Sequence, residues 1–216
     1  MNISIQQNIS FTSRNATIRR ADDIVRLSRN AFPMISSSRI DTFKNVSHFN
    51  DFLFKISREL NEERFRRLDK IHSHKSTVGK VFVLLKSLKT KKLGNCAEHA
   101  EVALLAAKFN GIKKAYLASL FTPDKKPLDH CIILVEDKKP YVIDGWLGFA
   151  DYVPEAVKRW QKEYNHMLDF AEAKTEKINI IKRRETLYDS FLEKDFSPLE
   201  EEIIKKFYPE LILNKK

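Results

Sequence analysis

Three side chains in the middle of the chain have types that could together perform nucleophilic chemistry: Cys96, His130 and Asp144. Cys96 follows Gly94 and Asn95 and opens an apolar stretch, so we expect it in the first turn of a helix. Helix N-termini carry unpaired backbone N–H groups and a positive partial charge, which favour a thiolate over a thiol. The same N–H groups can receive the oxyanion of a tetrahedral intermediate.

His130 and Asp144 are polar residues in two apolar runs that read as neighbouring strands. The Asp144 carboxylate, in Tyr-Val-Ile-Asp-Gly-Trp, is costly to bury unless another group pairs with it. Whether the two side chains share a face depends on the register of the strands. If the numbers of directly paired residues add up to an even value, as for Ile132 with Asp144, the side chains of His130 and Asp144 lie on one face of the sheet. A slip of one residue in the pairing places them on opposite faces. The sequence leaves this register open.

The elements that would position these residues are predicted by the spacing of apolar residues. Strands are expected at 115–121, 130–136 and 141–146, and the last two should form an antiparallel hairpin. Helices are expected at 17–32, 47–72, 78–88, 96–109, 155–171 and 198–207. Cys131, next to His130, should face the other side of its strand and pack in the core.

The helix at 96–109 is the most apolar of the predicted helices. Ten of its fourteen residues are apolar, so it should be buried almost all round. Asn95 is the expected N-cap, Glu98 completes a capping-box pair, and Gly111 follows the end. His99 is expected on the helix surface, near a cleft.

The order of these motifs resembles the papain-like and transglutaminase-like superfamily of cysteine enzymes. The resembling segments are Gly-Asn-Cys-Ala-Glu-His-Ala, Asp-His-Cys-Ile-Ile-Leu-Val and Val-Ile-Asp-Gly-Trp, within residues 93–148. The sequence is similar, more narrowly, to the bacterial toxin and effector branch, which includes glutamine deamidases and effector cysteine proteases. The resemblance implies Cys96 as nucleophile, His130 as general base and acid, and Asp144 as the group that orients the imidazole.

Two positions depart from the family pattern. Gly145 follows the aspartate, where the family often has proline, and no glutamine occurs between Gln7 and Gln161 to complete the oxyanion hole as in papain. The oxyanion would then be stabilised by hydrogen bonds from the Cys96 N–H and from a second donor that the sequence does not identify. The candidates for the oxyanion hole and the cleft are Gly94, Asn95, His99 and Trp146. Trp146 is also a candidate core aromatic.

We therefore predict an α+β fold in which a papain-like or transglutaminase-like core carries helical extensions at both ends of the chain. The segments would be 1–92, 93–150 and 151–216, in one compact domain. The expected function is thiol-dependent acyl transfer on a protein, with glutamine deamidation as the first choice. Transglutamination and proteolysis share the first half-reaction and stay open. No metal or cofactor is expected.

Other classes of function use some of the same residues. The sequences Cys-Ala-Glu at 96–98 and His-Ala-Glu at 99–101 resemble the zinc motif of nucleobase deaminases, which also needs a later Pro-Cys-x-x-Cys. A helical binding module with a degenerate cysteine-enzyme core is a further alternative. A structural zinc site would use Cys96, His99, His130 and Cys131.

The net charge, the apolar runs and the cysteine count limit the classes of partner and compartment that we expect. Thirty-nine Lys and Arg against 29 Asp and Glu give a net charge of +10, but the two signs are interspersed, so a mixed surface is favoured over a nucleic-acid site. No apolar run is long enough to span a membrane, and no Sec signal peptide is recognised. Two cysteines suit a reducing, cytoplasmic compartment. The resemblance implies a secreted effector with a host protein as substrate in the host cytosol. The oligomeric state stays open.

Overall fold

The computed structural model describes residues 16–36, 49–121, 127–164, 178–182 and 190–213. Within these ranges the chain forms seven α-helices and one five-stranded sheet, so the predicted α+β class is confirmed. The helices are α2 (Ala16–Ala31), α3 (Phe49–Ser73), α4 (Thr77–Lys91), α5 (Cys96–Phe109), α6 (Val153–Tyr164), α7 (Ser190–Glu193) and α8 (Pro198–Phe207), followed by the 3₁₀ turn η2 (Pro209–Leu211). The strands are β1 (Ala115–Phe121), β2 (Pro127–Val135), β3 (Tyr141–Asp144), β4 (Phe149–Tyr152) and β5 (Asn179–Lys182).

The sheet has the strand order β4-β3-β2-β1-β5, and every neighbouring pair is antiparallel. The predicted hairpin of the second and third expected strands is β2 and β3. β3 is shorter than the predicted strand 141–146, because Gly145 and Trp146 belong to the turn that leads into β4. The sequence reading missed β4 and β5, since each has four residues and is too short to show a period.

Two of the predicted helices differ most in extent from the structure, and one helix was not predicted. The helix predicted at 78–88 continues to Lys91, where Lys92 ends it in a left-handed conformation. The helix predicted at 155–171 begins at Val153 and is described to Tyr164, and its remaining residues lie outside the described part of the chain. The four-residue helix α7 was not predicted.

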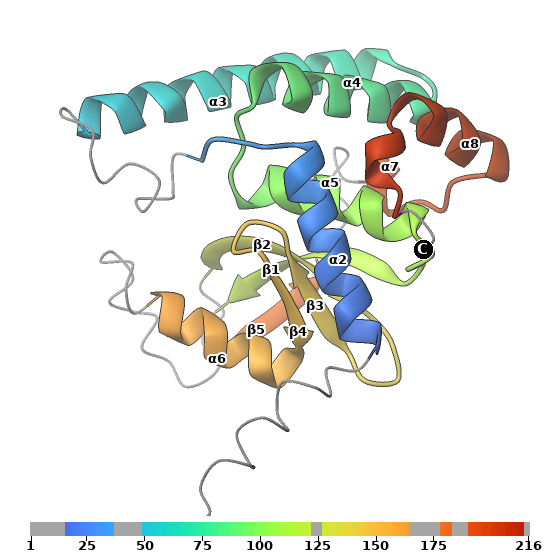
Figure 1. Cartoon of the computed structure of the whole chain (residues 1–216). Coiled ribbons are helices and arrows are strands. Elements are labelled where there is room, and N and C mark those ends of the chain that lie inside the picture. The colour runs from blue at the N-terminus through green and yellow to red at the C-terminus, as the bar shows by residue number, and fades with distance from the viewer. Residues whose placement is uncertain (1–15, 37–48, 122–126, 165–177, 183–189, 214–216) are drawn as a thin grey trace, which may run out of the picture.

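The sheet separates two apolar layers (Figure 1). α2 and α5 pack on one face, against alternate strand residues that include Leu117, Ile133 and Ile143. α6 packs on the other face, where Ile132, Val142 and Trp160 belong to a second cluster. α3 and α4 pack against each other and lie beyond α5 from the sheet (Figure 1).

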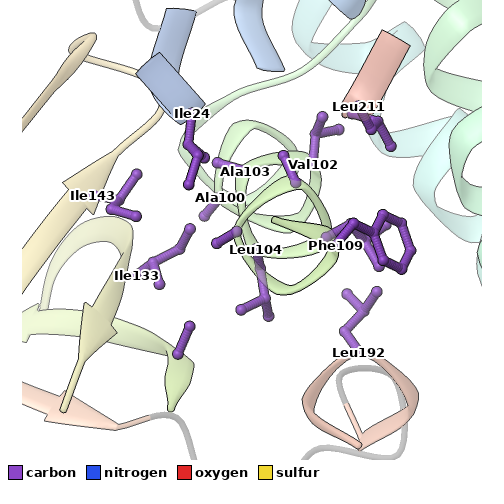
Figure 2. Close-up of a cluster of buried hydrophobic side chains, with 14 of the residues drawn as sticks. Ile24, Ala100, Val102, Ala103, Leu104, Phe109, Ile133, Ile143, Leu192 and Leu211 are labelled. Atoms are coloured by element: carbon purple, nitrogen blue, oxygen red, sulfur yellow. The ribbon is translucent and has the colours of Figure 1, made fainter. Parts of the chain in front are cut away.

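α5 is surrounded by apolar side chains, as its composition predicted. Figure 2 shows Ile24 of α2, two sheet residues, Ile133 and Ile143, and Leu192 of α7 converging on this helix. Its residues from Glu98 to Phe109 are all buried. A helix enclosed in this way has a fixed position, so the direction of its N-terminal turn is fixed by the core.

Gly145, directly after β3, lies against the backbone of α5. A Cβ atom at this position would be 2.8 Å from the carbonyl oxygen of His99 and 3.4 Å from the Ala103 Cβ. The glycine is therefore needed for the close approach of the turn after Asp144 to the helix that begins with Cys96.

We predict that Gly145→Ala destabilises the protein by roughly 1 to 3 kcal/mol, because the added methyl group must push the turn away from rigid helix backbone. Urea unfolding measures the change. Gly79→Ala in the first turn of α4 is the matched control: its Cβ would meet the side chains of exposed His74 and Ser76 rather than helix backbone, and the exposed His74 ring can move. Equal destabilisation by the two variants would contradict the role given to Gly145.

Candidate active site

Cys96 is the first residue of α5, and it is half-buried. The helix begins here because Asn95 has an extended backbone and its N–H is bound by the Glu98 carboxylate, 3.0 Å away. The Cys96 thiol donates to the carbonyl oxygen of Asp129, 3.7 Å from Sγ, and it is near enough to His130 to help raise the pKa of the imidazole. The thiol therefore sits where the N-terminal end of α5 meets the beginning of β2.

The register of β2 and β3 is the one that places His130 and Asp144 on the same face. Ile133 pairs with Ile143 and Leu134 with Val142, so opposed residue numbers have an even sum. The His130 Nε2 is 2.7 Å from the Asp144 Oδ2, and the two side chains are 2% and 0% exposed. Because Nε2 is bonded to Asp144, any contact of the ring with the Cys96 thiol goes through the other nitrogen, Nδ1.

Asp144 accepts hydrogen bonds from three donors. In addition to His130, the indole N–H of Trp160 in α6 donates to Oδ2 at 2.8 Å, and the backbone N–H of Leu147 donates to Oδ1 at 2.9 Å. A buried carboxylate needs such partners to remain ionised. The turn after β3 and helix α6 therefore both contribute to holding Asp144 as an anion.

The buried pair changes the protonation of both partners. Burial alone would lower the pKa of His130, but the charge and hydrogen bond of Asp144, with a smaller contribution from Cys96, outweigh it and raise the pKa to about 10. Burial alone would raise the pKa of Asp144, but the charge of His130 and the three hydrogen bonds hold this pKa below its ordinary value. At neutral pH the pair is an imidazolium and a carboxylate.

Two indole rings flank the imidazole. The centroid of Trp146 is 5.3 Å from that of His130, and the centroid of Trp160 is 6.4 Å away. Trp146 is buried, so it is a core aromatic rather than an exposed wall of a groove. Its Nε1 donates to the Ser36 Oγ at 3.0 Å, and that hydroxyl donates to the Asn95 Oδ1 at 2.8 Å. This chain of hydrogen bonds links Trp146, beside His130, to Asn95, the residue before the nucleophile.

The other cleft candidates have structural reasons for their identity. Gly94 is buried, and a Cβ there would lie 2.5 Å from the Met34 Sδ, so the glycine serves packing. His99 is buried, which corrects the prediction of a helix-surface residue; the turn at Gly145 covers this part of α5. Among the four candidates, Asn95 is half-exposed beside Cys96.

Asp129 has a left-handed backbone, with φ of 47°, directly before His130. This conformation is uncommon outside glycine, although aspartate adopts it more readily than most residues. The irregularity comes at the point where the Asp129 carbonyl faces the Cys96 Sγ. A strained backbone beside reactive side chains is typical of functional sites.

The structure also bears on the zinc alternative. Cys131 is buried in the core cluster on the α5 side of the sheet, as predicted, whereas the adjacent His130 bonds Asp144 and lies beside Trp160 of α6. Within the described ranges, no three His, Cys, Asp or Glu side chains gather as metal ligands would.

Four contributors to the site were missed in the sequence: Ser36, Arg64, Arg67 and Trp160. Arg64 and Arg67 of α3 bind the Glu98 carboxylate, and Trp160 binds Asp144. Each is distant in sequence from its partner except Trp160, and none belongs to a motif. Only the unusual burial of polar partners in apolar segments could have indicated that such residues were needed.

A cavity of about 520 Å³ lies at the opposite end of α5 from Cys96. Gly111, Lys113 and Tyr141 are among its lining residues, and none of the site residues described above lines it. Since a helix rises about 1.5 Å per residue, roughly 20 Å of α5 separate this cavity from the thiol.

Comparisons with protein-family models, with curated proteins and with solved structures found no match to this chain. No helix in the described part of the chain is both long and apolar enough to cross a membrane.

We predict that Asp144→Asn moves the titration of His130 from about pH 10 to below 6.5, because burial then acts without the opposing charge. NMR of the imidazole protons measures this change. Asp151→Asn is the control. Asp151 lies on the neighbouring strand β4 and forms its ion pair with Arg159 of α6, 3.1 Å away. Unchanged titration of His130 in Asp144→Asn would contradict the assignment of the pair.

The same pair gives the stability of the fold a pH dependence with a defined sign. The raised pKa of His130 means that its contribution is complete below pH 6.5 and is lost as the pH rises toward 10. The lowered pKa of Asp144 means that its contribution is present above pH 3.8 and is lost in acid. Stability measured by urea unfolding should therefore depend less on pH above 6.5 in Asp144→Asn than in the wild type.

Proposed function

We propose that this protein is a thiol-dependent acyl-transfer enzyme of the papain-like or transglutaminase-like kind. The observation that carries the proposal is the 2.7 Å hydrogen bond between buried His130 and Asp144 on two adjacent strands, with the Cys96 thiol at a helix N-terminus 3.7 Å from the carbonyl oxygen of the residue before His130. Each residue type and contact matches a role in nucleophilic catalysis: sulfur attacks, imidazole transfers protons, and carboxylate orients the imidazole.

In the first half-reaction, the Cys96 sulfur, as thiolate, attacks the carbonyl carbon of a carboxamide. The C=O bond becomes a C–O⁻ single bond, and the N-terminal N–H groups of α5 lie on the side where they can stabilise this oxyanion. The tetrahedral intermediate collapses with loss of the nitrogen, which takes the Nδ1 proton of the His130 imidazolium. The products are a thioester on Cys96 and ammonia or an amine.

In the second half-reaction, neutral His130 accepts a proton from water as the water oxygen attacks the thioester carbonyl. Collapse of this intermediate breaks the C–S bond and releases a carboxylic acid, and the sulfur and imidazole return to their starting protonation. Asp144 keeps its negative charge throughout and stabilises the imidazolium whenever it is present.

The burial of the site supports a glutamine side chain as the acyl donor. The side chains of His130 and Asp144 are 2% and 0% exposed, and of the three residues only the nucleophile is half-exposed. A narrow carboxamide can approach the sulfur end-on, whereas a peptide bond must bring two flanking stretches of main chain with it. We therefore place glutamine deamidation of a protein substrate before proteolysis.

We predict that iodoacetamide alkylates half-exposed Cys96 rapidly at pH 6 and leaves buried Cys131 unmodified, because the proposed mechanism requires a reactive nucleophile at Cys96. Mass spectrometry of the intact protein and its peptides measures both sites. The rate at Cys96 should fall by roughly tenfold or more in His130→Gln, which keeps an N–H donor near Asp144. Slow alkylation of Cys96 in the folded wild type, equal to that of an ordinary thiol, would refute the catalytic proposal.

Acyl transfer itself is tested with p-nitrophenyl acetate, an activated ester. The wild type should give a burst of p-nitrophenolate and an acetyl group on Cys96, and Cys96→Ala should give neither while unfolding at the same urea concentration. Release of ammonia from the peptide benzyloxycarbonyl-Gln-Gly without cleavage of its backbone would favour deamidation, and cleavage of the peptide bond would favour proteolysis.

A further inference from the structure

We propose that Glu98 is a positioning residue for Cys96, and that Arg64 and Arg67 of α3 hold it in place. The inference rests on the function proposed above, because it gives helix α3 a role in fixing the position of the nucleophile. Glu98 touches neither Cys96 nor a substrate; it acts through Asn95, the residue that precedes the nucleophile.

The Glu98 carboxylate has four donors. Its Oε1 accepts from the Arg64 Nε at 2.6 Å and the Arg67 Nη2 at 2.9 Å. Its Oε2 accepts from the Arg64 Nη2 at 2.7 Å and the Asn95 backbone N–H at 3.0 Å. Two oxygens with about four lone-pair positions are thus fully used, and the side chain has a single orientation.

The group is buried and remains charged. Glu98 and Arg67 have side chains that are 1% and 2% exposed, and Arg64 is 36% exposed. Burial alone would raise the pKa of Glu98, but the hydrogen bonds and charges of the two arginines lower it to about 2. Glu98 is therefore an anion at neutral pH.

Capping alone does not account for this arrangement. A capping residue typically contributes about 1 kcal/mol and can do so at the surface, where water solvates the carboxylate. Removing a carboxylate and a guanidinium from water costs several kcal/mol for each ion, and apolar replacements of such groups are often as stable. A buried ionic cluster at this place is better explained by the geometry that it enforces than by the stability that it adds.

That geometry concerns the turn that carries the thiol. Glu98 fixes the backbone N–H of Asn95, while Ser36 fixes its side-chain Oδ1 at 2.8 Å. With main chain and side chain both held, the peptide between Asn95 and Cys96 has little freedom, and the Cys96 Sγ stays beside His130. A misplacement of about 1 Å at a reacting atom can cost about a hundredfold in rate.

The connection gives α3 a function in the site. This helix packs on α4, on the far side of α5 from the sheet (Figure 1). Its two arginines reach the first turn of α5, so a displacement of α3 would be felt at the nucleophile without any contact between α3 and a substrate.

The test is Arg64→Gln, with Arg66→Gln as a matched control on the same helix. Arg66 is 56% exposed and forms ion pairs with Glu62 at 3.2 Å and Glu63 at 3.5 Å on its own helix, so its loss should have little effect. We measure the alkylation rate of Cys96 by iodoacetamide and the acetylation burst with p-nitrophenyl acetate, together with the urea midpoint of each full-length variant.

We expect Arg64→Gln to reduce both the alkylation rate and the acetylation rate by roughly ten- to a hundredfold, while Arg66→Gln matches the wild type. Both rates are measured under conditions in which each variant is folded. Arg64→Lys, which restores the charge without the two-pronged contact, should recover part of the loss. If Arg64→Gln lowers the urea midpoint but alkylates and acetylates at the wild-type rate, Glu98 is a structural cap and the proposal is wrong.

Glu98→Gln gives a second, independent test, since glutamine can still accept from the Asn95 N–H but removes the carboxylate charge that the two arginines bind. Reactivity at Cys96 should fall in this variant also, and wild-type reactivity in its folded form would overturn the proposal. Failure of the underlying function looks different: the wild type itself would then show an inert Cys96 and no burst.

Discussion

The site depends on one buried anion, the Asp144 carboxylate at the end of β3. Its desolvation is compensated by donors from three separate parts of the fold: His130 on β2, the Leu147 N–H in the following turn, and Trp160 on α6. Each of these donors is held by the requirement to satisfy the carboxylate, because an unpaired buried charge costs several kcal/mol. The imidazole orientation, the β3–β4 turn and the placement of α6 are thus linked through a single group.

The position of Cys96 follows from a second constraint, the burial of α5. Because the helix is enclosed from Glu98 to Phe109, its N-terminal turn can point only toward the ends of the strands. At Gly94 the chain lies close to Met34 and Glu98, and at Gly145 it lies close to His99 and Ala103. In both places a Cβ atom would be too near its neighbours. Packing therefore delivers the thiol to the imidazole, and the local polar contacts at Asn95 and Glu98 refine where it lies.

Local patterns predicted much of this. The Gly-Asn before Cys96 and the glutamate three residues after Asn95 predicted the start of α5, and the alternation of apolar residues predicted β1 and the β2–β3 hairpin. The parity rule for the register stated which pairing would bring His130 and Asp144 together, and the structure has that pairing. The choice between registers could not be made from sequence, since it depends on which face α6 covers.

The contacts that the sequence did not reveal are those between distant segments. Arg64 and Glu98 are 34 residues apart, and Ser36 and Trp146 are 110 apart. Nothing in a charged amphipathic helix distinguishes the arginines that reach the core from a surface arginine such as Arg66. Such pairings arise only once the layers are assembled, and the short strands β4 and β5 are likewise defined by their neighbours.

The buried carboxylates of Asp144 and Glu98 differ in what their cations can do. Asp144 is paired with an imidazolium, which can give up its proton to a leaving group and take one from water, so this pair can change its protonation during a reaction. Glu98 is paired with two guanidinium groups, which stay protonated, so this cluster keeps its charge and its geometry. A catalytic thiol needs both properties at once, and here they are supplied by separate ion pairs on the sheet and on α3.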